Sequence, residues 1–408
     1  MSESHCIIIG GSHAAAQLAT SLRQNKWDGK ITLVSAEPVL PYHRPPLSKT
    51  YLSGDKSLHD ILIRPQNFYE KNDIHTQLGV TVTRIDRNAK KVFLDDGAEL
   101  SYSKLALTTG SKVRKINIPG CELNGVFYLR DMNDVDNIRR FVGKGKKAVI
   151  VGGGYIGLET AAALRKISMD VTVLEALPRV LQRVTSPEIS AFYTRIHTEE
   201  GVKILTEKAI ESIGGSQHVE SVRCSDGTEL EADLVIIGIG ILPVTDLAED
   251  TGLKVDNGIV VDEYARTSDH DIVAAGDCTF HYNPIYKRHL RLESVQNASD
   301  QAKVAADTLC GKQHTYNALP WFWSDQYDLK LQIAGLSQGF DQVVIRGDIA
   351  NGRSFSAFYL QQGRLLAVDA INNPRDFMMA KRVLTGEVFP DLAKLADPET
   401  NIQDALGC

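Results

Sequence analysis

The sequence predicts an α/β protein with two doubly wound parallel sheets, and three observations support this class. Two short apolar runs, at residues 6–9 and 148–151, each lead directly into a glycine-rich turn. After each turn comes a helical pattern and then another apolar run. Each of these units is followed by an Asp-Gly turn and by a strand pattern that ends in glycine. Parallel strands that alternate with helices need both faces covered, which is typical of an open α/β sheet.

The two units can be followed element by element. The expected elements are strand 6–9, helix 14–25 and strand 31–34 in the first unit, and strand 148–151, helix 158–166 and strand 171–174 in the second. Hairpins are expected at Asp96-Gly97 and Asp226-Gly227, because Asp-Gly between apolar runs favours a tight turn. From about residue 320, apolar and polar residues alternate in strands 330–335, 343–346, 354–360 and 365–371, with helix 377–385 among one or two closing helices. This last part therefore predicts a small antiparallel sheet.

Composition excludes several classes of protein. The 408 residues include 43% hydrophobic and 24% charged residues, enough for two or three domains with a buried core. A net charge of −6 argues against nucleic-acid binding, and the longest apolar stretch, residues 234–244, is shorter than the roughly 20 residues that span a membrane. Residues 1–5 carry no basic group of a secretory signal. Six scattered cysteines without metal-ligand spacing predict thiols in a reducing cytoplasm.

The glycine-rich turns indicate dinucleotide binding. At a strand-to-helix junction, small residues let the backbone approach a pyrophosphate, and the helix N-terminus directs free N–H groups toward it. Gly152, Gly154 and Gly157 fit the full G-x-G-x-x-G pattern. Two such turns predict two Rossmann-like domains, in which one dinucleotide reduces another.

Glu175 ends the strand that follows the second turn. A carboxylate there accepts hydrogen bonds from the ribose hydroxyls and repels a 2′-phosphate, so NADH is expected in preference to NADPH. If Glu175 turned away, Arg179 or Arg183 would be able to pair with that phosphate.

Three further segments carry a family resemblance: a strand that ends in Gly276-Asp277, the proline-rich segment 41–49, and the aromatic segment 321–326. With both turns, they make essentially the whole chain resemble the NADH-dependent ferredoxin reductases of bacterial cytochrome P450 and aromatic-ring dioxygenase systems. The resemblance implies bound FAD, NADH as reductant and a [2Fe–2S] ferredoxin that feeds a cytochrome P450 or Rieske oxygenase. It implies a glutathione-reductase-like two-nucleotide fold, with an FAD domain in two segments (1–112 and 242–319), an inserted NAD domain (113–241) and a C-terminal α+β domain (320–408).

The resemblance also assigns residues to FAD. Gly10 and Ala15 match the first fingerprint, whereas Ser12 stands in place of its middle glycine and can turn its hydroxyl outward to donate a hydrogen bond. Glu37 matches the acid that holds the adenosine ribose, and Asp277 the acid that contacts the ribityl chain. The residues assigned to FAD are Gly10, Ser12, His13, Ala14, Ala15, Glu37, Arg44, Lys49, Val82, Thr109, Gly110, Arg130, Asp277, Val295 and Trp323.

The residues assigned to NADH are Gly152, Gly154, Tyr155, Ile156, Gly157, Glu159, Glu175, Arg183, Gly238, Ile239 and Gly240. Lys49, Glu159 and Trp323 are the candidate catalytic residues. A lysine beside the flavin would stabilise the anionic reduced ring, and Glu159 would offset and orient the lysine. Alternatively, Glu159 is an exposed acid that only complements the helix dipole.

Trp321 and Trp323 are expected on opposite faces of one strand, with Trp323 beside the flavin and Trp321 in the core. Charged side chains that would attract an acidic ferredoxin are candidates for a basic rim: Arg291, Lys303, Lys381 and Arg382. The histidines, among them His5, His13, His43, His281, His289 and His314, have no metal-ligand spacing, so no metal site is expected.

Two other functions compete with a ferredoxin reductase. Disulfide reductases with two nucleotide sites need a redox cysteine pair, and the related peroxidases and oxidases need one cysteine, but segment 41–49 has none. An NADH oxidase-like or NADH-sensing flavoprotein without a dedicated ferredoxin remains the alternative.

Overall fold

The computed structural model describes residues 4–407. The chain divides into two compact units, each built from separated segments. Unit 1 comprises Met1–Arg44, Leu58–Lys112 and Leu242–Pro320, and unit 2 comprises Pro45–Ser57, Val113–Ile241 and Trp321–Cys408. The chain passes between the units five times, and two of these crossings lie within β8 (Ser111–Val113) and β17 (Ile241–Pro243). The finer division into four domains stays a prediction.

Unit 1 is organised around a parallel five-stranded sheet. The strands, in spatial order, are β19 (Ile272–Ala274), β7 (Lys104–Leu107), β1 (His5–Ile9), β2 (Lys30–Ser35) and β3 (Ile74–Leu78). Two three-stranded sheets accompany it: β4 (Val82–Asp86), β5 (Lys91–Leu94) and β6 (Glu99–Ser101), and β18 (Ile259–Val261), β20 (Thr279–Asn283) and β21 (Arg288–Leu290). Short helices α2 (Leu58–Ile61), α3 (Gln66–Lys71) and α7 (Asp246–Asp250) complete the unit.

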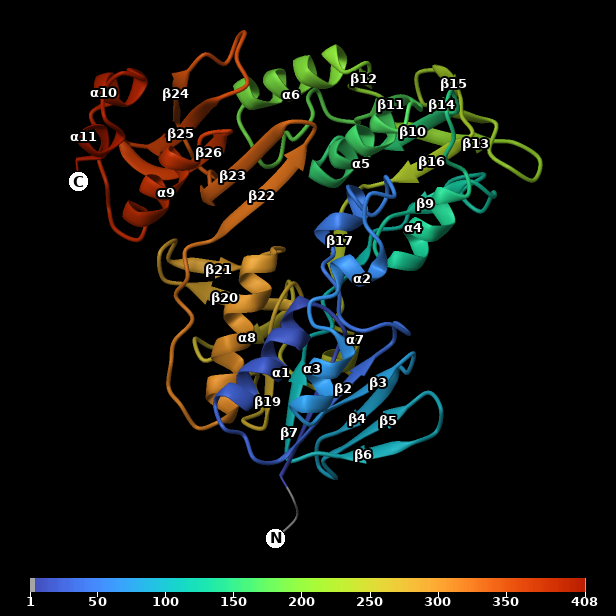
Figure 1. The fold of residues 1–408 in the computed structure, drawn as a ribbon, viewed down its shortest axis with the longest axis vertical. Coiled ribbons are helices and arrows are strands. Elements are labelled where there is room, and N and C mark those ends of the chain that lie inside the picture. The colour runs from blue at the N-terminus through green and yellow to red at the C-terminus, as the bar shows by residue number, and fades with distance from the viewer. Residues whose placement is uncertain (1–3, 408) are drawn as a thin grey trace. The chain divides into compact units, whose positions relative to one another are not determined.

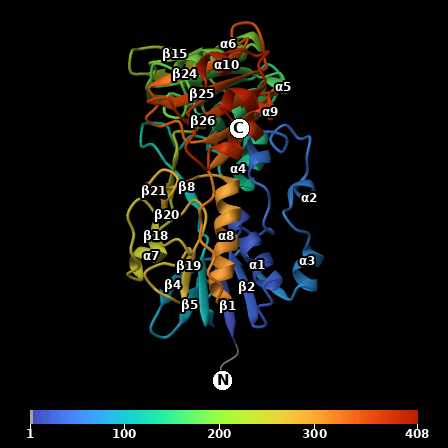
Figure 2. The ribbon, with the colours of Figure 1, turned by 90° about the vertical axis from the view of Figure 1, so that its left-hand side faces the viewer.

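Two alanine-rich helices, α1 (His13–Gln24) and α8 (Val295–Leu309), pack on one face of the unit 1 sheet. Figures 1 and 2 both show them side by side. Small buried residues such as Ala15 and Ala302 let the helices approach each other and the sheet closely, with Ile8 beneath them. The opposite face is covered by the sheet β4–β6, through Val82 and Val92. The sheet is thus buried on both faces, as its apolar strands predict.

Unit 2 repeats this plan with a second parallel sheet. Its strands, in order, are β12 (Lys203–Leu205), β11 (Asp170–Leu174), β10 (Lys147–Val151), β16 (Leu234–Ile237) and β9 (Val126–Tyr128). The accompanying elements are α4 (Met132–Arg139), α5 (Tyr155–Lys166), α6 (Pro187–Glu199), the 3₁₀ turn η1 (Pro45–Ser48) and the antiparallel strands β13 (Ile210–Gly214), β14 (Ser221–Cys224) and β15 (Glu229–Glu231).

Unit 2 also contains the C-terminal antiparallel sheet, drawn in orange to red in Figure 1. Its strands, in order, are β22 (Trp321–Gln326), β23 (Leu329–Gly335), β26 (Arg364–Ile371), β25 (Phe355–Gln361) and β24 (Gln342–Gly347). Three helices follow or accompany it: α9 (Pro374–Val383), α10 (Leu392–Ala396) and α11 (Ile402–Leu406).

The expected fold class is confirmed, and the observed elements match the predicted ones to within a few residues. Both Asp-Gly turns connect antiparallel strands, with Gly97 and Gly227 at positive φ. The expectation of one or two closing helices was too low, because α10 and α11 are each only five residues long and lack a long apolar period. No helix within residues 4–407 is long and apolar enough to cross a membrane. Five cysteines of this part of the chain are free thiols, whereas Cys408 lies outside the described residues, as do residues 1–3.

Candidate dinucleotide-binding and redox site

The first glycine turn lies between β1 and α1, at the carboxyl edge of the unit 1 sheet. Gly10 has a φ of +131°, and a Cβ there would lie 2.2 Å from the Thr108 carbonyl oxygen. A Cβ on Gly11 would lie 2.1 Å from the Ser35 hydroxyl. Ser12 is the N-cap of α1, but its side chain does not cap the helix. The N-terminus of α1 is therefore left without a cap from the Ser12 side chain, which fits the pyrophosphate of a dinucleotide.

Glu37 follows β2 and is joined to the same turn through Arg44. Arg44 forms an ion pair with Glu37 and donates from Nε to the Ser12 hydroxyl oxygen at 3.2 Å. The Tyr42 hydroxyl donates to the other Glu37 oxygen at 2.5 Å. Sequence reasoning missed Tyr42, although it lies in the singled-out segment 41–49. Ser12, Glu37 and Arg44 thus form one cluster, as their common assignment to FAD requires.

Other residues assigned to FAD come from the neighbouring strands β7 and β19. Thr109 and Gly110 follow β7, and Asp277 follows β19, so both groups lie at the carboxyl edge where ligands of open α/β sheets bind. The Ser111 hydroxyl donates to Asp277 Oδ2 at 2.9 Å. A cavity of about 220 Å³ is lined by His13 and Val295, among others.

Ala14 and Ala15 are buried in the first turn of α1, with Ala15 packed in the core at the position of the third fingerprint glycine. One predicted residue is not directed at this cluster, because the Val82 side chain packs in the core beneath the sheet. Three other residues assigned to FAD belong to unit 2: Lys49, Arg130, whose backbone N–H donates to Asp134, and Trp323. Local sequence patterns carry no register for Val82 relative to the turn.

The second glycine turn lies between β10 and α5, and each of its three fingerprint glycines has a different structural role. Gly152 has a φ of +113°, and its Cβ would lie 2.3 Å from the Gly238 carbonyl oxygen. A Cβ on Gly157 would lie 2.1 Å from the Gly152 carbonyl oxygen, so close packing of helix against strand requires this glycine. Around Gly154, by contrast, a Cβ would meet no atom within 4 Å. That open space, beside a helix start without a side-chain cap, fits the close approach of a pyrophosphate.

Gly238, Ile239 and Gly240 follow β16, which pairs with β10, so they lie beside the second turn. Tyr155 and Ile156 begin α5, where the Ile156 side chain is 48% exposed.

The Glu175 carboxylate is directed at the second turn. Its Oε2 accepts from the Gly153 N–H at 2.8 Å, and its Oε1 accepts from the Leu177 N–H at 2.9 Å. The sequence left open that Arg179 or Arg183 would pair with a 2′-phosphate. The Arg179 guanidinium already has partners within the protein, because it donates to the carbonyl oxygens of Thr185 and Gln182 and to the Ser190 hydroxyl. Arg183 is exposed and forms no ion pair or hydrogen bond with another described residue.

A buried ion pair joins two of the candidate catalytic residues. Lys49 Nζ lies 2.5 Å from Glu159 Oε2, and the Glu159 side chain is only 2% exposed. The Ser48 hydroxyl donates to the same oxygen at 2.6 Å, and the Ser324 hydroxyl donates to Oε1 at 2.5 Å. The alternative of an exposed first-turn acid is therefore wrong. Sequence reasoning missed both serines as partners, although each is the chain neighbour of a predicted residue, Lys49 or Trp323.

The expectation that Trp321 and Trp323 lie on opposite faces of their strand was wrong, whereas Trp323 beside the flavin stays a prediction. The Trp321 and Trp323 rings lie 5.6 Å apart, because residues two apart in a strand share one face of the sheet. Trp321 is half-buried rather than a core residue, and Lys381 Nζ lies 4.5 Å from its ring centroid. Trp323 is also half-buried and precedes Ser324, which ties its strand to Glu159.

The proposed basic rim is divided between the units. In unit 1, Arg291 pairs with Glu293, and Lys303 pairs with Asp300 at 2.9 Å. In unit 2, Lys381 and Arg382 occupy the last turn of α9.

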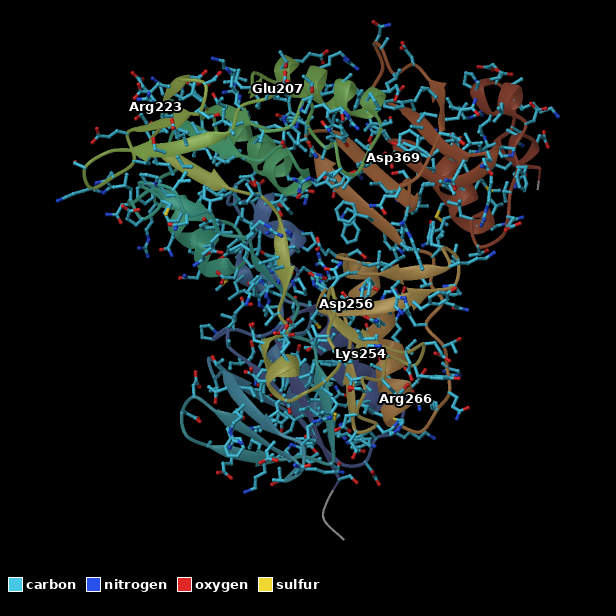
Figure 3. All side chains as sticks on the ribbon, turned by 180° about the vertical axis from the view of Figure 1, so that it is seen from behind. Glu207, Arg223, Lys254, Asp256, Arg266 and Asp369 are labelled. Atoms are coloured by element: carbon cyan, nitrogen blue, oxygen red, sulfur yellow. The ribbon has the colours of Figure 1, made fainter. Side chains whose placement is uncertain are left out.

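Residues 4–407 contain no group of three His, Cys, Asp or Glu side chains arranged for a metal ion. Among the histidines, His281 is 2% exposed, and burial lowers its pKa to about 4, so the ring is neutral. A larger cavity of about 830 Å³ in unit 1 is lined by Lys254, Arg266 and Tyr282, among others, and by none of the predicted site residues. Lys254 and Arg266 are labelled in Figure 3.

Comparison with known proteins agrees with this geometry. The family model for pyridine nucleotide-disulphide oxidoreductases matches residues 4–302, and the model for the reductase C-terminal domain matches residues 321–406. Putidaredoxin reductase of Pseudomonas putida is 42% identical over 98% of this chain and 96% of its own length. The ferredoxin–NAD(+) reductase component of the anthranilate 1,2-dioxygenase system of Burkholderia cepacia is 40% identical over the full length of both chains.

Among solved structures, the covalent putidaredoxin reductase–putidaredoxin complex matches with a TM-score of 0.95 and 41% identity, over 99% of this chain and 98% of the other. The resemblance inferred from the sequence motifs is thereby confirmed. The chain belongs to the pyridine nucleotide-disulphide oxidoreductases and, within them, to the ferredoxin reductases similar to putidaredoxin reductase.

Proposed function

We propose that this protein is an FAD-containing NADH–ferredoxin reductase. The observation that carries the proposal is the presence of two independent glycine turns, each at the carboxyl edge of its own parallel sheet and each followed by a helix whose N-cap residue provides no side-chain cap. Putidaredoxin reductase and the ferredoxin–NAD(+) reductase component of an anthranilate 1,2-dioxygenase system share 42% and 40% of this sequence over nearly its whole length. The function, cofactors and partner class that the sequence motifs imply therefore agree with those of the named relatives.

The reaction is the transfer of two electrons and one proton from NADH, and it delivers two reduced [2Fe–2S] ferredoxins, NAD⁺ and one free proton. FAD supplies the step between a two-electron donor and a one-electron acceptor. The chain provides binding, orientation and electrostatics. In unit 1, the Gly10–Ser12 turn and the Glu37–Arg44 pair hold the adenosine half of FAD, and Asp277 holds its ribityl chain.

In unit 2, Gly154 leaves room for the NADH pyrophosphate, and Glu175 reads the ribose. Because Glu175 already accepts two backbone hydrogen bonds, its carboxylate is held in place before NADH arrives. A fixed negative charge at this point repels a 2′-phosphate, which favours NADH over NADPH.

We assign the Lys49–Glu159 pair to the control of charge at the flavin. Two serine hydroxyls and one ammonium group satisfy the buried Glu159 carboxylate, so the position of Lys49 is fixed. A fixed cation stabilises negative charge that develops on reduction without having to reorganise. Trp323 remains our candidate for the aromatic neighbour of the flavin.

The acceptor is an acidic [2Fe–2S] ferredoxin that feeds a cytochrome P450 or a Rieske oxygenase. Lys381 and Arg382, in the last turn of α9, supply part of the attraction, and Arg291 and Lys303 are weaker candidates because each already has an acidic partner. The NADH oxidase-like alternative is opposed by the absence of cysteine from segment 41–49, whereas the NADH-sensing alternative is distinguished by the response to added ferredoxin. Five free thiols within residues 4–407 support work in the reducing cytoplasm.

The proposal is tested by NADH-driven reduction of cytochrome c, with and without an added [2Fe–2S] ferredoxin. We expect the ferredoxin to raise the rate strongly, and we expect Lys381→Glu/Arg382→Glu to raise the KM for ferredoxin while anaerobic reduction of FAD by NADH stays unchanged. Lys394→Glu, a charge reversal on α10, serves as the matched control. A rate that ferredoxin does not raise would favour the oxidase or sensor function.

A further inference from the structure

A buried acid of the C-terminal sheet contacts the loop that carries Arg183. Asp369, in β26, is 1% exposed and is labelled within this sheet in Figure 3. Its Oδ2 accepts from the Thr185 hydroxyl at 2.8 Å and from the Tyr359 hydroxyl at 2.5 Å. Thr185 and Tyr359 are themselves 2.8 Å apart, hydroxyl to hydroxyl. The three side chains form a closed triangle within unit 2, and Thr185 is its only member outside the C-terminal sheet.

Thr185 lies near the end of the loop 176–186, which we call the nucleotide loop. At its start, the Leu177 N–H donates to Glu175. In its middle, the Leu181 N–H donates to the Gly153 carbonyl oxygen of the second glycine turn at 2.9 Å, and Leu181 adopts a φ of +55°. At its end, Thr185 reaches Asp369. Arg183 therefore stands between one anchor on the glycine turn and one anchor on the C-terminal sheet.

The interior of the loop is also fixed. Arg179 donates to the carbonyl oxygens of Thr185 and Gln182, so it closes the loop from within. Arg183 has no such bonds and is exposed, which leaves it as the one cation of the loop that is free to meet an anionic ligand within the described structure. Arg183 binds a ligand tightly only if the backbone of the loop is held in place, because a mobile loop must be ordered on binding and this costs conformational entropy.

We propose that Asp369 and Thr185 are positioning residues for NADH: the C-terminal sheet fixes the nucleotide loop, and through it Arg183, against the adenosine diphosphate half of the nucleotide. This inference rests on the proposed NADH site in unit 2. It assigns the C-terminal sheet a part in nucleotide affinity, through residues that do not belong to either glycine fingerprint. No bond is made or broken by either residue.

The test measures the affinity of the FAD-loaded protein for ADP-ribose, which carries the adenosine diphosphate half without the nicotinamide. Thr185→Val keeps the shape of the side chain but removes the hydroxyl, and Asp369→Leu removes the acceptor. We expect each change to weaken ADP-ribose binding by about 10-fold or more, the effect of losing a hydrogen bond to a charged group. Thr185→Ser and Asp369→Asn keep donor and acceptor and are expected to bind within about 2-fold of the wild type, by the same estimate.

Asp376→Asn is the matched control. Asp376 is 3% exposed and lies in the first turn of α9, where its backbone N–H donates to the side chain of the N-cap residue Asn373. Its Oδ2 lies 3.4 Å from Arg346 Nε, and it has no hydrogen bond or ion pair with the nucleotide loop within the described residues. We expect this change to lower the unfolding temperature while ADP-ribose affinity stays unchanged. Equal weakening by Asp376→Asn, or unchanged affinity in Thr185→Val, would overturn the inference.

In steady-state turnover, Thr185→Val should raise the KM for NADH and leave kcat at saturating NADH unchanged. If Thr185→Val does not fold, amide exchange of the wild type decides instead: ADP-ribose should protect both 176–186 and 367–370, and no change at 367–370 would contradict the inference. If the wild type reduces ferredoxin normally and all the variants bind ADP-ribose as tightly as the wild type does, only this inference is refuted. Wild-type protein that does not bind ADP-ribose refutes the proposed NADH site as well.

Discussion

Asp369 makes the free energy of unfolding depend on pH, and we expect Asp369→Asn to remove this dependence. Burial raises the pKa of its carboxyl group from 3.8 to about 6, and the hydrogen bonds from Thr185 and Tyr359 offset only part of that rise. Since a raised pKa means that the folded state holds this proton more tightly, the acid contributes its stability below pH 3.8. That contribution is lost as the pH rises to about 6.

The magnitude follows from the shift. A difference of about 2 pKa units corresponds to about 3 kcal/mol at 1.36 kcal/mol per unit. Asp369→Asn stays neutral at every pH and keeps an acceptor for Thr185. The unfolding free energy of the variant, relative to wild type, should therefore increase by up to about 3 kcal/mol between pH 4 and pH 7.

Thermal unfolding at a series of pH values measures this difference. For a unit of 150–250 residues, about 3 kcal/mol corresponds to roughly 6–12 °C in the unfolding midpoint. Other titrating groups are common to both proteins, so they cancel in the difference. A gap between variant and wild type that is constant from pH 4 to pH 7 would refute a buried, proton-binding Asp369.

Three further predictions concern the candidate site. Glu175→Ala should narrow the preference for NADH over NADPH by about 10-fold, since it removes a charge–phosphate repulsion of about 1.4 kcal/mol; unchanged ratios of kcat/KM would show that another residue reads the ribose. Asp277→Ala should weaken FAD retention, checked by the ratio of flavin to protein absorbance after gel filtration, and fully loaded protein would remove Asp277 from the site. Lys49→Met should destabilise unit 2 by about 3–5 kcal/mol, because it leaves the Glu159 carboxylate buried without a cation. Lys49→Met/Glu159→Gln should recover most of that loss in urea unfolding, and a double variant no more stable than Lys49→Met would contradict the pairing.

Local sequence patterns were sufficient to predict the parallel sheets and both turns. Apolar runs followed by glycine specify a strand end with little help from distant residues, and the carboxyl ends of parallel strands meet at one edge. Gly10, Gly152 and Glu175 could therefore be placed at that edge from the amino-acid sequence alone. Periodicity was also sufficient to predict the C-terminal sheet, although the faces of Trp321 and Trp323 were assigned wrongly, against the two-residue period of a strand.

Contacts between distant segments could not be predicted in the same way. Ser48 and Ser324 are separated by 276 positions in the sequence, and only folding brings both hydroxyls to Glu159. Asp369 reaches Thr185 across 184 residues. An isolated serine or aspartate carries no periodic signal, so its partner emerges only from the packing of whole elements.

The central claim is that electrons enter from NADH in pairs and leave singly to a ferredoxin. Anaerobic titration of the purified yellow protein tests it most directly. We expect NADH to bleach the flavin absorbance, and oxidised [2Fe–2S] ferredoxin to restore it at about two ferredoxins for each NADH consumed. A protein that purifies without flavin, or whose colour survives excess NADH, would contradict the account.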